Sequence, residues 1–412
     1  MKKAVIPVVL AALLLPAAGA GSVEVRFDYP HNYATGSSYP YGLFPTDLDG
    51  DGDTDLAVCD HIANHVAILL NNGYGSFFLT GTYPVGDYPL RVFSADFDSD
   101  GNSDLVTANH NSDNVSILLG NGDGTFAAAV NYAAGANPKS VFATDLDGDG
   151  DADLAVTNMS SDDVSILMNN GYGSFAAAVN YPVGDYPFPV FAADFDNDGL
   201  SDLAVGNYFS STVSILWNRG GTFADAEDYP VGNRPHAIEA ADFDGDGYFD
   251  LAVTNYFDSN VSILLNNGDN TFAAAVNYDA GGYPNSLCAA DFDGDGDSDL
   301  AVLSNTVGAA IVMPSNGDGT FGAKLDFTVG TNPRSMDAAD FDGDGDIDLV
   351  ACVGWTYDVA VLFNLTPVEC PECPPPCLRA DANDSGQFDV VDVIYLVDYL
   401  WNNGPAPVPC PE

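Results

Sequence analysis

The sequence predicts an all-β protein: a seven-bladed β-propeller closed by an N-terminal strand, followed by a small C-terminal helical module with one calcium-type loop. Three observations predict this fold. An acidic loop of the pattern Asp-x-Asp-x-Asp-Gly-x-x-Asp recurs, each repeat contains four strand-like segments, and a segment before the first loop supplies what the last repeat lacks. The loops begin at Asp47, Asp96, Asp145, Asp194, Asp242, Asp291 and Asp340, which are 49 residues apart except for one interval of 48. A repeat of this length has the size of one propeller blade.

The acidic loop has the ligand chemistry of a calcium site. Calcium takes roughly six to eight oxygen ligands, and alternate residues of a tightly turning loop aim their side chains at one point. Four aspartates of each copy supply side-chain oxygens, and the residue after the glycine supplies its backbone carbonyl. From the first copy to the last, these predicted ligands are Asp47, Asp49, Asp51, Asp53 and Asp55; Asp96, Asp98, Asp100, Asn102 and Asp104; Asp145, Asp147, Asp149, Asp151 and Asp153; Asp194, Asp196, Asp198, Leu200 and Asp202; Asp242, Asp244, Asp246, Tyr248 and Asp250; Asp291, Asp293, Asp295, Asp297 and Asp299; and Asp340, Asp342, Asp344, Asp346 and Asp348.

The variation among the copies agrees with these roles. The residue after the glycine changes freely, for example to Leu200 or Tyr248, whereas every side-chain position is aspartate. Without metal, clustered carboxylates repel one another by roughly 3–4 kcal/mol per pair. We therefore expect about seven calcium ions to stabilise the propeller. The alternative is that these segments are only acidic turns, because Asp and Gly favour turns in any case.

Each repeat contains four strand signals. In the second repeat they are residues 92–97, 105–108, 115–119 and 126–132, and an Asn-Gly turn such as Asn121-Gly122 joins the third signal to the fourth. The seventh repeat ends after its third strand. The segment Val23–Pro30 resembles the missing fourth strand, so we expect it to complete the seventh blade and to close the ring, which removes exposed sheet edges.

Composition limits the partners and the compartment. The formal net charge is −50, with 60 acidic and 10 basic residues, which argues against nucleic acid or an anionic membrane as partner. Lys2 and Lys3, the apolar run 4–15 and the small residues 18–20 form a predicted signal peptide over residues 1–20, so we expect a secreted or cell-surface protein without membrane insertion. Cys59, Cys288 and Cys352 lie in apolar strand segments and are predicted to be buried.

The C-terminal part differs from the repeats. Residues 367–377 are rich in Pro and Cys and predict a stiff linker after the propeller (21–366). Residues 378–412 contain a loop with EF-hand spacing, followed by helical periodicity over 390–400. The predicted ligands of one further calcium ion are Asp381, Asn383, Ser385, Gln387, Asp389 and Asp392. Cys370, Cys373, Cys377 and Cys410 favour disulfides over a zinc site in an exported chain, with the pairing left open.

The acidic loops, together with motifs such as Asn-Gly-Asp-Gly-Thr-Phe at 121–126, resemble the FG-GAP/VCBS repeats of integrin-α-type calcium propellers over about residues 23–365. This resemblance implies calcium loops on one face and ligands on the opposite face. The tail resembles half of a type I dockerin, which implies anchoring to a cohesin-like extracellular partner. Dockerins carry two such loops, and Ser385 replaces their usual acidic ligand. The alternative is a C-terminal cap that recognises nothing.

A ligand site is predicted near a proline that recurs seven residues before every loop. Basic residues near this proline differ from blade to blade, and they predict an anion-accepting rim for uronic acids or an acidic peptide. They are Arg91, Lys139, Arg234, His236 and Arg334. The alternative is charge compensation beside acidic neighbours. Tyrosines in the same connections suit either sugar stacking or packing between blades, and their recurrence favours packing.

No catalytic constellation is evident. The chain has no Gly-x-Ser-x-Gly elbow, no phosphate-binding loop and no His-Glu-x-x-His helix, and its five histidines are scattered among the blades. We therefore expect a secreted recognition or adhesion protein that binds an extracellular protein or polysaccharide, not an enzyme. The alternatives are a polysaccharide lyase of propeller type and a purely structural surface or matrix component.

Overall fold

The computed structural model describes residues 25–365. The predicted signal peptide, the linker, the C-terminal module with its loop at Asp381–Asp392, and four of the cysteines lie outside the described residues. The described residues form seven sheets, each of four antiparallel strands, and no helix. Among these residues, therefore, no helix is long and apolar enough to cross a membrane. The predicted all-β seven-bladed propeller is confirmed.

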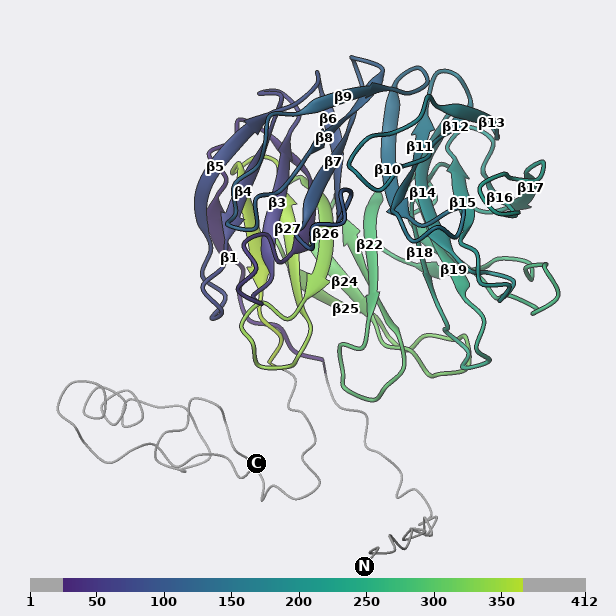
Figure 1. Cartoon of the computed structure of the whole chain (residues 1–412). Helices are drawn as coiled ribbons and strands as arrows, with labels where there is room; N and C mark the ends of the chain where they lie inside the picture. The colour runs from purple at the N-terminus through teal and green to yellow at the C-terminus, as the bar shows by residue number, and fades with distance from the viewer. Residues whose placement is uncertain (1–24, 366–412) are drawn as a thin grey trace, which may run out of the picture. The chain divides into compact units, whose positions relative to one another are not determined.

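Each blade runs from an inner first strand to an outer fourth strand (Figure 1). The first strands are β2 (Pro40–Thr46), β6 (Pro89–Ala95), β10 (Pro138–Thr144), β14 (Pro187–Ala193), β18 (Pro235–Ala241), β22 (Pro284–Ala290) and β26 (Pro333–Ala339). The second strands are β3 (Asp55–Asp60), β7 (Asp104–Asn109), β11 (Asp153–Asn158), β15 (Asp202–Asn207), β19 (Asp250–Asn255), β23 (Asp299–Ser304) and β27 (Asp348–Val353). The third strands are β4 (His65–Leu70), β8 (Asn114–Leu118), β12 (Asp163–Leu167), β16 (Thr212–Leu216), β20 (Asn260–Leu264), β24 (Ala309–Met313) and β28 (Asp358–Leu362). The fourth strands are β5 (Phe78–Pro84), β9 (Val130–Ala133), β13 (Val179–Pro182), β17 (Glu227–Pro230), β21 (Val276–Asp279), β25 (Leu325–Thr328) and β1 (His31–Ala34).

Burial explains the composition of the strands. Every residue of the second strands is buried, so these strands read as apolar runs such as Leu-Ala-Val. In the fourth strands, at least every second residue is exposed, and these strands carry polar residues. The apolar core lies between neighbouring blades, where fully buried loop residues such as Phe97 pack edge-to-face on the next blade's Phe175, at 5.5 Å between ring centroids. Cys59, Cys288 and Cys352 are buried and free, as predicted.

The N-terminal strand closes the ring, but it lies later in the chain than predicted. β1 pairs with β28 of the seventh blade, with His31 opposite Val361. The described part of the predicted segment, residues 25–30, precedes this strand. Phe27 instead forms an isolated bridge with Asn364, as Phe126 does with Gly120, and its ring packs on Phe327 at 5.0 Å. The predicted position was wrong because the fourth strand of most blades has only four residues and begins four residues after the recurring phenylalanine, at Val130 and not at Phe126.

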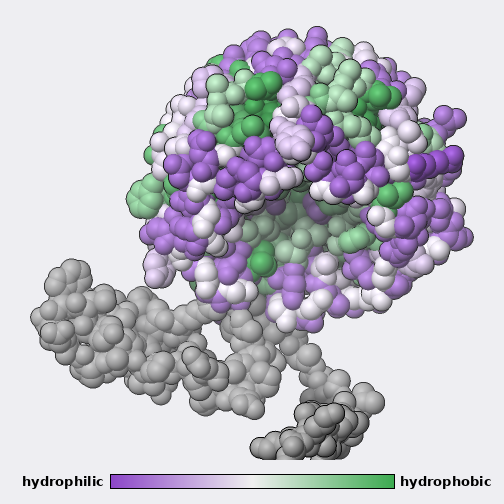
Figure 2. Space-filling model, viewed as in Figure 1, coloured by the Kyte–Doolittle hydropathy of each residue, from purple (hydrophilic) through white to green (hydrophobic). Residues whose placement is uncertain are grey.

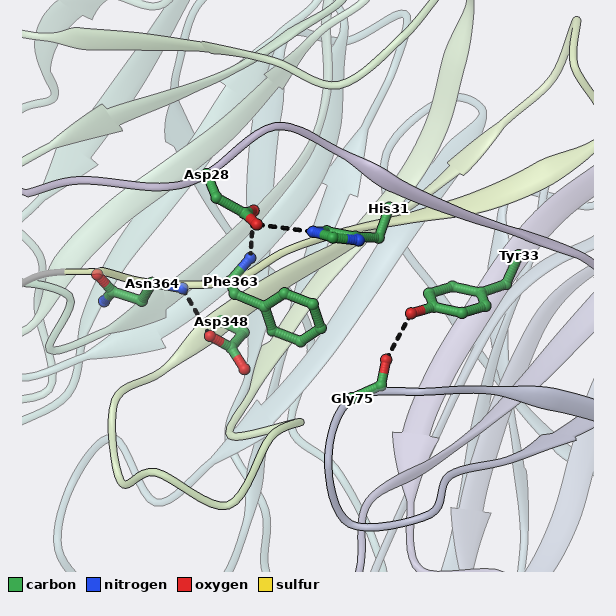
Figure 3. A network of polar contacts seen from close by, with 7 residues as sticks. All are labelled: Asp28, His31, Tyr33, Gly75, Asp348, Phe363 and Asn364. Atoms are coloured by element: carbon green, nitrogen blue, oxygen red, sulfur yellow. Dashed lines mark hydrogen bonds and ion pairs between the residues drawn. The ribbon is translucent and has the colours of Figure 1, made fainter. Parts of the chain in front are cut away.

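Polar contacts secure this closure (Figure 3). The Asp28 carboxylate accepts hydrogen bonds from the backbone N–H of Phe363 (3.1 Å) and from His31 Nε2 (2.7 Å). The Tyr33 hydroxyl donates to the carbonyl of Gly75 in the first blade at 2.6 Å, and the N–H of Asn364 donates to Asp348 at 2.7 Å. The closing strand is therefore tied to both the seventh and the first blades.

An asparagine after the third strand clamps most blades to the preceding one. Asn169 Nδ2 donates to the carbonyl of Phe97 in the preceding blade (2.9 Å) and to the carbonyl of Ala152 (3.1 Å). The same clamp recurs at Asn71, Asn218, Asn266 and Asn364, and Asn71 reaches Phe341 of the last blade. Gly120 and Ser315 occupy the position in the other two blades.

Replacement of Asn169 by Ala is expected to lower the free energy of unfolding by about 2 kcal/mol, because it removes the side-chain hydrogen bonds to the carbonyls of Phe97 and Ala152. The Phe97 carbonyl keeps the N–H of Gly173 as a partner, and the N–H of Asn170 keeps the carbonyl of Ser174. Urea unfolding in calcium measures the difference. Asn121→Ala is the matched control, since Asn121 is exposed and its amide contacts Thr125 alone; its effect is expected within about 0.5 kcal/mol. Equal effects of the two substitutions would contradict the clamp.

Candidate functional site

The acidic loops connect the first and second strands of every blade, so all seven lie at one end of the propeller. In four of them the carboxylates of the first, third and ninth residues converge, with ligand oxygens within 4.8 Å of one another, as for Asp47, Asp49 and Asp55. In the fifth loop the converging residues are Asp242, Asp244 and Asp246, and two more groups in the described chain meet the same criterion. An all-carboxylate oxygen set of this kind fits a hard cation such as calcium.

Backbone hydrogen bonds shape the loop around these carboxylates. Asp47 Oδ1 accepts the N–H of Gly50 at 2.7 Å, and its Oδ2 accepts the N–H of Gly52 at 3.1 Å. Gly52 has a φ of 93°, which favours glycine. The fifth-position aspartate is outside the converging group in the first four loops, and Asp51 Oδ1 accepts the N–H of Asp53 at 2.9 Å. That the seventh residue contributes its carbonyl to the ion stays a prediction.

The ninth aspartate also joins the loop to the core. Asp153 accepts hydrogen bonds from the N–H of Leu146 (3.0 Å) and of Asn169 (2.7 Å) while it is almost fully buried. Burial raises the pKa of this carboxyl to about 6, although the two hydrogen bonds oppose the shift. Burial likewise raises the pKa of Asp55, Asp202, Asp250, Asp299 and Asp348 to about 7 and that of Asp104 to about 6. A bound cation would remove the cost of ionising these groups.

The opposite end of the propeller contains a cavity on the central axis. The first strands contact one another around the ring and line a cavity of about 190 Å³. All seven recurring prolines begin a register shift that leaves extra residues between the paired strands, as between Pro138 and Ser140. A bulge of this kind redirects the side chains beside it. Figure 2 shows one face hollowed near its centre, with apolar surface inside a mainly hydrophilic rim.

Four of the five predicted ligand residues line this cavity: Arg91, Lys139, His236 and Arg334. Lys139 Nζ donates to the hydroxyl of Tyr41 at 3.1 Å and lies 4.2 Å from the ring centroid of Phe188. Arg334 Nη2 donates to the hydroxyl of Tyr39 at 2.7 Å, and its Nε is buried without a partner. The two cations are therefore paired with phenols and rings, and not with carboxylates.

These contacts also set the ionisation of the neighbouring groups. Burial opposes ionisation of Tyr41, but the charge and the hydrogen bond of Lys139, with the charge of Arg334, outweigh it and lower the pKa of Tyr41. Burial, together with the charge of Lys139, lowers the pKa of His236 to about 3. His236 is thus neutral at pH 7, and Nδ1 lies 2.8 Å from the carbonyl of Asn285. It contributes hydrogen bonding to the mouth, and no positive charge.

Arg234 is not brought into the cavity. Its guanidinium lies 3.6 Å from the ring centroid of Phe257 and donates to the hydroxyl of Tyr208 at 3.1 Å, on the rim of the mouth. Lys139, Arg234 and Arg334 therefore contact aromatic groups and not carboxylates. Arg91 instead acts on the buried carboxyls of Glu239 and Asp337, which agrees with the alternative of charge compensation.

Aromatic rings surround the mouth. Tyr186, Phe188, Tyr208, His236, Tyr256 and Tyr283 form one series of contacts, with centroids 4.8 Å apart between Phe188 and Tyr208 and 4.9 Å between Tyr256 and Tyr283. A second series joins Tyr39, His61 and Tyr88. Several rings of the loops at this end are open to solvent, including Phe209 (57 % exposed) and Trp355 (68 %). Sugar rings and apolar side chains both bind to such surfaces.

The two tyrosines of the Tyr-Pro-Val-Gly-Asp-Tyr-Pro segments have different places. The first tyrosine packs edge-to-face on a phenylalanine: Tyr83 on Phe126, and Tyr181 on Phe223. The expected packing role therefore agrees with the contacts of this tyrosine. The second, as Tyr88 or Tyr186, lies in the aromatic series at the mouth. Sequence reasoning also missed Tyr39, Tyr41, Asn285, Glu239 and Asp337, which lie at or near the cavity. A break in the repeat could have revealed Glu239 and Asp337. The fourth residue after the recurring proline is Phe in four blades, but it is Glu239, Cys288 or Asp337 in the other three.

Comparisons with known proteins agree with this architecture. The family profile described as FG-GAP-like repeat matches six overlapping segments, residues 47–107, 96–156, 145–205, 194–253, 242–302 and 291–351. No curated protein matches the sequence.

Solved structures that resemble this chain share its fold at low sequence identity. The N-terminal part of BBS1 in complex with ARL6 superposes with a TM-score of 0.60 at 14% identity, covering 84% of this chain and 98% of that one. Virginiamycin B lyase from Staphylococcus aureus superposes with a TM-score of 0.58 at 13% identity, covering 82% of this chain and 99% of that one. An Agrocybe aegerita lectin that recognises terminal N-acetylglucosamine gives 0.51 at 21%, covering 79% and 85%. The similarity to these structures shows the propeller fold alone.

Proposed function

The chain belongs to the FG-GAP-like repeat family, and from this premise we propose that it is a secreted, calcium-stabilised recognition protein whose ligand binds at the mouth opposite the acidic loops. One observation carries the proposal: Lys139 and Arg334 face a cavity on the axis without carboxylate partners, inside a rim of exposed aromatic rings. A cavity with a few convergent polar groups and apolar walls is the usual form of a binding site.

Calcium has a structural role in this proposal. About seven ions occupy the acidic loops, held by the first, third, fifth and ninth aspartates and the carbonyl of the seventh residue. The bound ions neutralise the clustered carboxylates and hold the connections between the first and second strands. They leave the opposite end of the channel free for a ligand.

The ligand is an acidic extracellular molecule, a polysaccharide with uronic acids or an acidic peptide. Lys139 and Arg334 bind its carboxylate, and the guanidinium of Arg334 offers the unpartnered Nε–H. His236 and Asn285 add neutral hydrogen bonding, while Tyr88, Tyr186 and Phe209 contact sugar rings or side chains. Arg234 stabilises the aromatic rim and attracts anions to it.

Export and anchoring complete the proposal. The predicted signal peptide directs the chain out of the cell, and the dockerin-like tail, which lies outside the described residues, attaches it to a cohesin-like partner. Co-purification of the full chain with cohesin domains in calcium, and its loss after Asp381→Ala, tests the anchor independently of the propeller.

Replacement of both Lys139 and Arg334 by Met is expected to weaken binding to acidic glycans or peptides by roughly 100-fold, because each charge-assisted hydrogen bond contributes about 1.5–3 kcal/mol. A glycan and protein array in calcium identifies the ligand, and titration measures the change. Lys324→Met is the matched control, since Lys324 pairs with Asp279 on the outer strands at 2.6 Å. A wild-type protein that binds nothing on the array would favour a purely structural role.

A second candidate function has one specific observation in its favour. The phenol of Tyr41 lies between Lys139 and Arg334, whose charges lower its pKa although burial opposes the shift, so an ionisable oxygen lies beside two groups that can neutralise a carboxylate. This arrangement suits elimination from a uronic acid, in which the base takes the proton next to the carboxylate and the neighbouring C–O bond breaks. Incubation with acidic polysaccharides, monitored by the ultraviolet absorbance of unsaturated products, tests for a lyase; Tyr41→Phe would abolish the signal.

A further inference from the structure

The channel below the mouth has two unlike sides. On one side Phe44, Phe93, Phe142 and Phe191 form a continuous wall, with neighbouring ring centroids 4.4, 4.7 and 5.0 Å apart. On the other side, at the equivalent positions of β18 and β26, Glu239 and Asp337 line the same cavity. We call these two carboxyls and the facing phenylalanine wall the channel floor. The fourth residue after the recurring proline is therefore phenylalanine in the first four blades, whereas two of the last three blades carry a carboxyl there.

The two carboxyls of the channel floor have no salt-bridge partner. Among residues 25–365, no basic nitrogen lies within 4.0 Å of Glu239 or Asp337. The positive charge that acts on both carboxyls is that of Arg91, which belongs to the second blade. Arg91 Nη1 then donates to the hydroxyl of Ser335 at 3.3 Å, and not to a carboxylate.

The surroundings leave a deficit of positive charge at the channel floor. Burial, followed by the charge of Asp337, raises the pKa of Glu239 to about 8 even though Arg91 opposes the shift. Burial also raises the pKa of Asp337. Among the other titratable groups nearby, His236 and the buried Cys288 are neutral at pH 7. Lys139 and Arg334 keep their charge, but they contact tyrosines at the mouth, and Arg91 is the cation that acts on the two carboxyls. In the free protein, a proton on Glu239 neutralises one of the two carboxyls and so balances the charge.

An independent observation points to a missing hydrogen-bond donor. Asn285 lines the same cavity and is only 6 % exposed, and its Nδ2 donates to the carbonyl of Pro333 at 2.8 Å. Its Oδ1 has no hydrogen-bond partner. A buried acceptor without a donor costs about 1–3 kcal/mol, so a ligand that donates here recovers this energy.

We infer that the channel floor binds a primary ammonium group, held by Glu239 and Asp337 with Asn285 Oδ1 as a further acceptor, while the phenylalanine wall contacts the apolar body that carries it. A cation facing aromatic rings gains from their negative faces as well as from the carboxylates. The inference rests on the proposed function in one respect, that the ligand enters at the mouth. Its carboxylate binds to Lys139 and Arg334, so the complete ligand carries both charges.

Ammonium binding exchanges one proton for one ligand charge. At pH 7 the ammonium group replaces the proton on Glu239, which passes to the buffer, and the carboxylate then faces the ammonium ion. Binding is therefore expected to strengthen as the pH rises from 6 to 8, and close to one proton is expected to be released per ligand at pH 7.

Calorimetric titration of the full chain in calcium tests this with four matched probes: 2-phenylethylamine, 2-phenylethanol, 3-phenylpropionate and phenylalanine. The amine is expected to bind roughly tenfold more tightly than the alcohol, and phenylalanine more tightly than either singly charged probe. Repeating the amine titration in buffers of different ionisation enthalpy measures the released proton. Glu239→Gln, which keeps the shape of the protonated side chain, is expected to remove both the preference for amine and the proton release.

Glu227→Gln is the matched control, because Glu227 lies exposed on the outer strand β17 and its replacement should leave both readouts unchanged. Equal affinity for amine and alcohol in the wild-type protein, or an unchanged amine preference in Glu239→Gln, would overturn the inference. If Glu239→Gln does not fold, proton release by the wild-type protein decides the question. If the wild-type protein binds 2-phenylethylamine but not 3-phenylpropionate, the proposed carboxylate site at the mouth is contradicted, whereas the ammonium site at the channel floor is supported.

Discussion

Removal of calcium is expected to lower the melting temperature of this protein by at least 10 °C. If each acidic loop has a dissociation constant near 1 mM, 10 mM calcium contributes about 1.4 kcal/mol per site, which sums to roughly 10 kcal/mol over seven sites. The physical reason is that the converging carboxylates, within 4.8 Å of one another in loops such as Asp47–Asp55, repel when no cation lies between them. Thermal unfolding followed by circular dichroism, in calcium and after dialysis against a chelator, measures the difference.

The pH dependence of this effect has a definite sign. The ninth aspartates of the loops have pKa values raised to about 6 or 7 by burial, above their unfolded value of 3.8. Between pH 4 and 7 the folded, metal-free protein therefore binds more protons than the unfolded chain, so its stability falls as the pH rises through this window. The metal-free protein should melt higher at pH 5 than at pH 7.5, and the gain from calcium should be larger at pH 7.5.

Two substitutions separate site binding from general charge effects. Asp153→Asn removes one ligand and one titrating group, so it should reduce the calcium-induced shift and make the metal-free protein less sensitive to pH. Asp123→Asn removes an exposed carboxylate that contacts Thr125 outside the acidic loop. It should change neither the calcium-induced shift in melting temperature nor the pH dependence of the metal-free protein. A melting temperature that stays the same after calcium removal would contradict the stabilising role of the loops.

Deletion of residues 25–34 is expected to destabilise the propeller by roughly 5 kcal/mol and to make it self-associate. The deletion removes the buried side chain of Val25, the contact of Phe27 with Phe327, and the backbone pairing of β1 with β28. It also exposes the edge of β28, which then offers unpaired backbone groups to another chain. Thermal unfolding and light scattering in calcium measure the two effects.

Tyr29→Ala is the control for this deletion. Tyr29 lies in the same segment, but its side chain is 74% exposed and stacks only on His31, so its replacement is expected to cost less than about 1 kcal/mol. A deletion variant that stays monomeric and melts with the wild-type protein would show that the ring does not depend on its closing strand.

The particular elements show where sequence reasoning succeeds. The interval of the acidic loops predicted the number and the order of the blades, because each repeat is one sheet that cannot bury its faces without neighbours. The second strands were located to within a residue or two, since Leu105–Ala108 is a mainly apolar segment with Asp104 and Asn109 on either side. The closing strand was displaced by several residues because the outer strands are exposed and carry little apolar pattern, so a phenylalanine that makes only a bridge was taken as the strand.

The candidate sites divide in the same way. The acidic loops are local: their ligands lie within nine residues of one another, and their spacing alone predicts that the carboxylates converge. The mouth and the channel floor depend on side chains from different blades, such as Lys139 with Tyr41, Arg334 with Tyr39, and Arg91 with Ser335. Basic residues near the recurring proline were recognised, but their aromatic partners were not, because contacts around a ring join residues that no sequence interval relates.

By itself, the sequence determined that this protein is a ring of seven small sheets with an acidic loop on each, because a repeated local pattern specifies both the strands and the turn that holds the carboxylates together. Only the tertiary structure decided what the centre of the ring contains. Closing the ring brings one residue from each blade to the same level of the axis, so four phenylalanines come to face Glu239 and Asp337, and that meeting depends on the curvature of the whole fold and not on any single repeat.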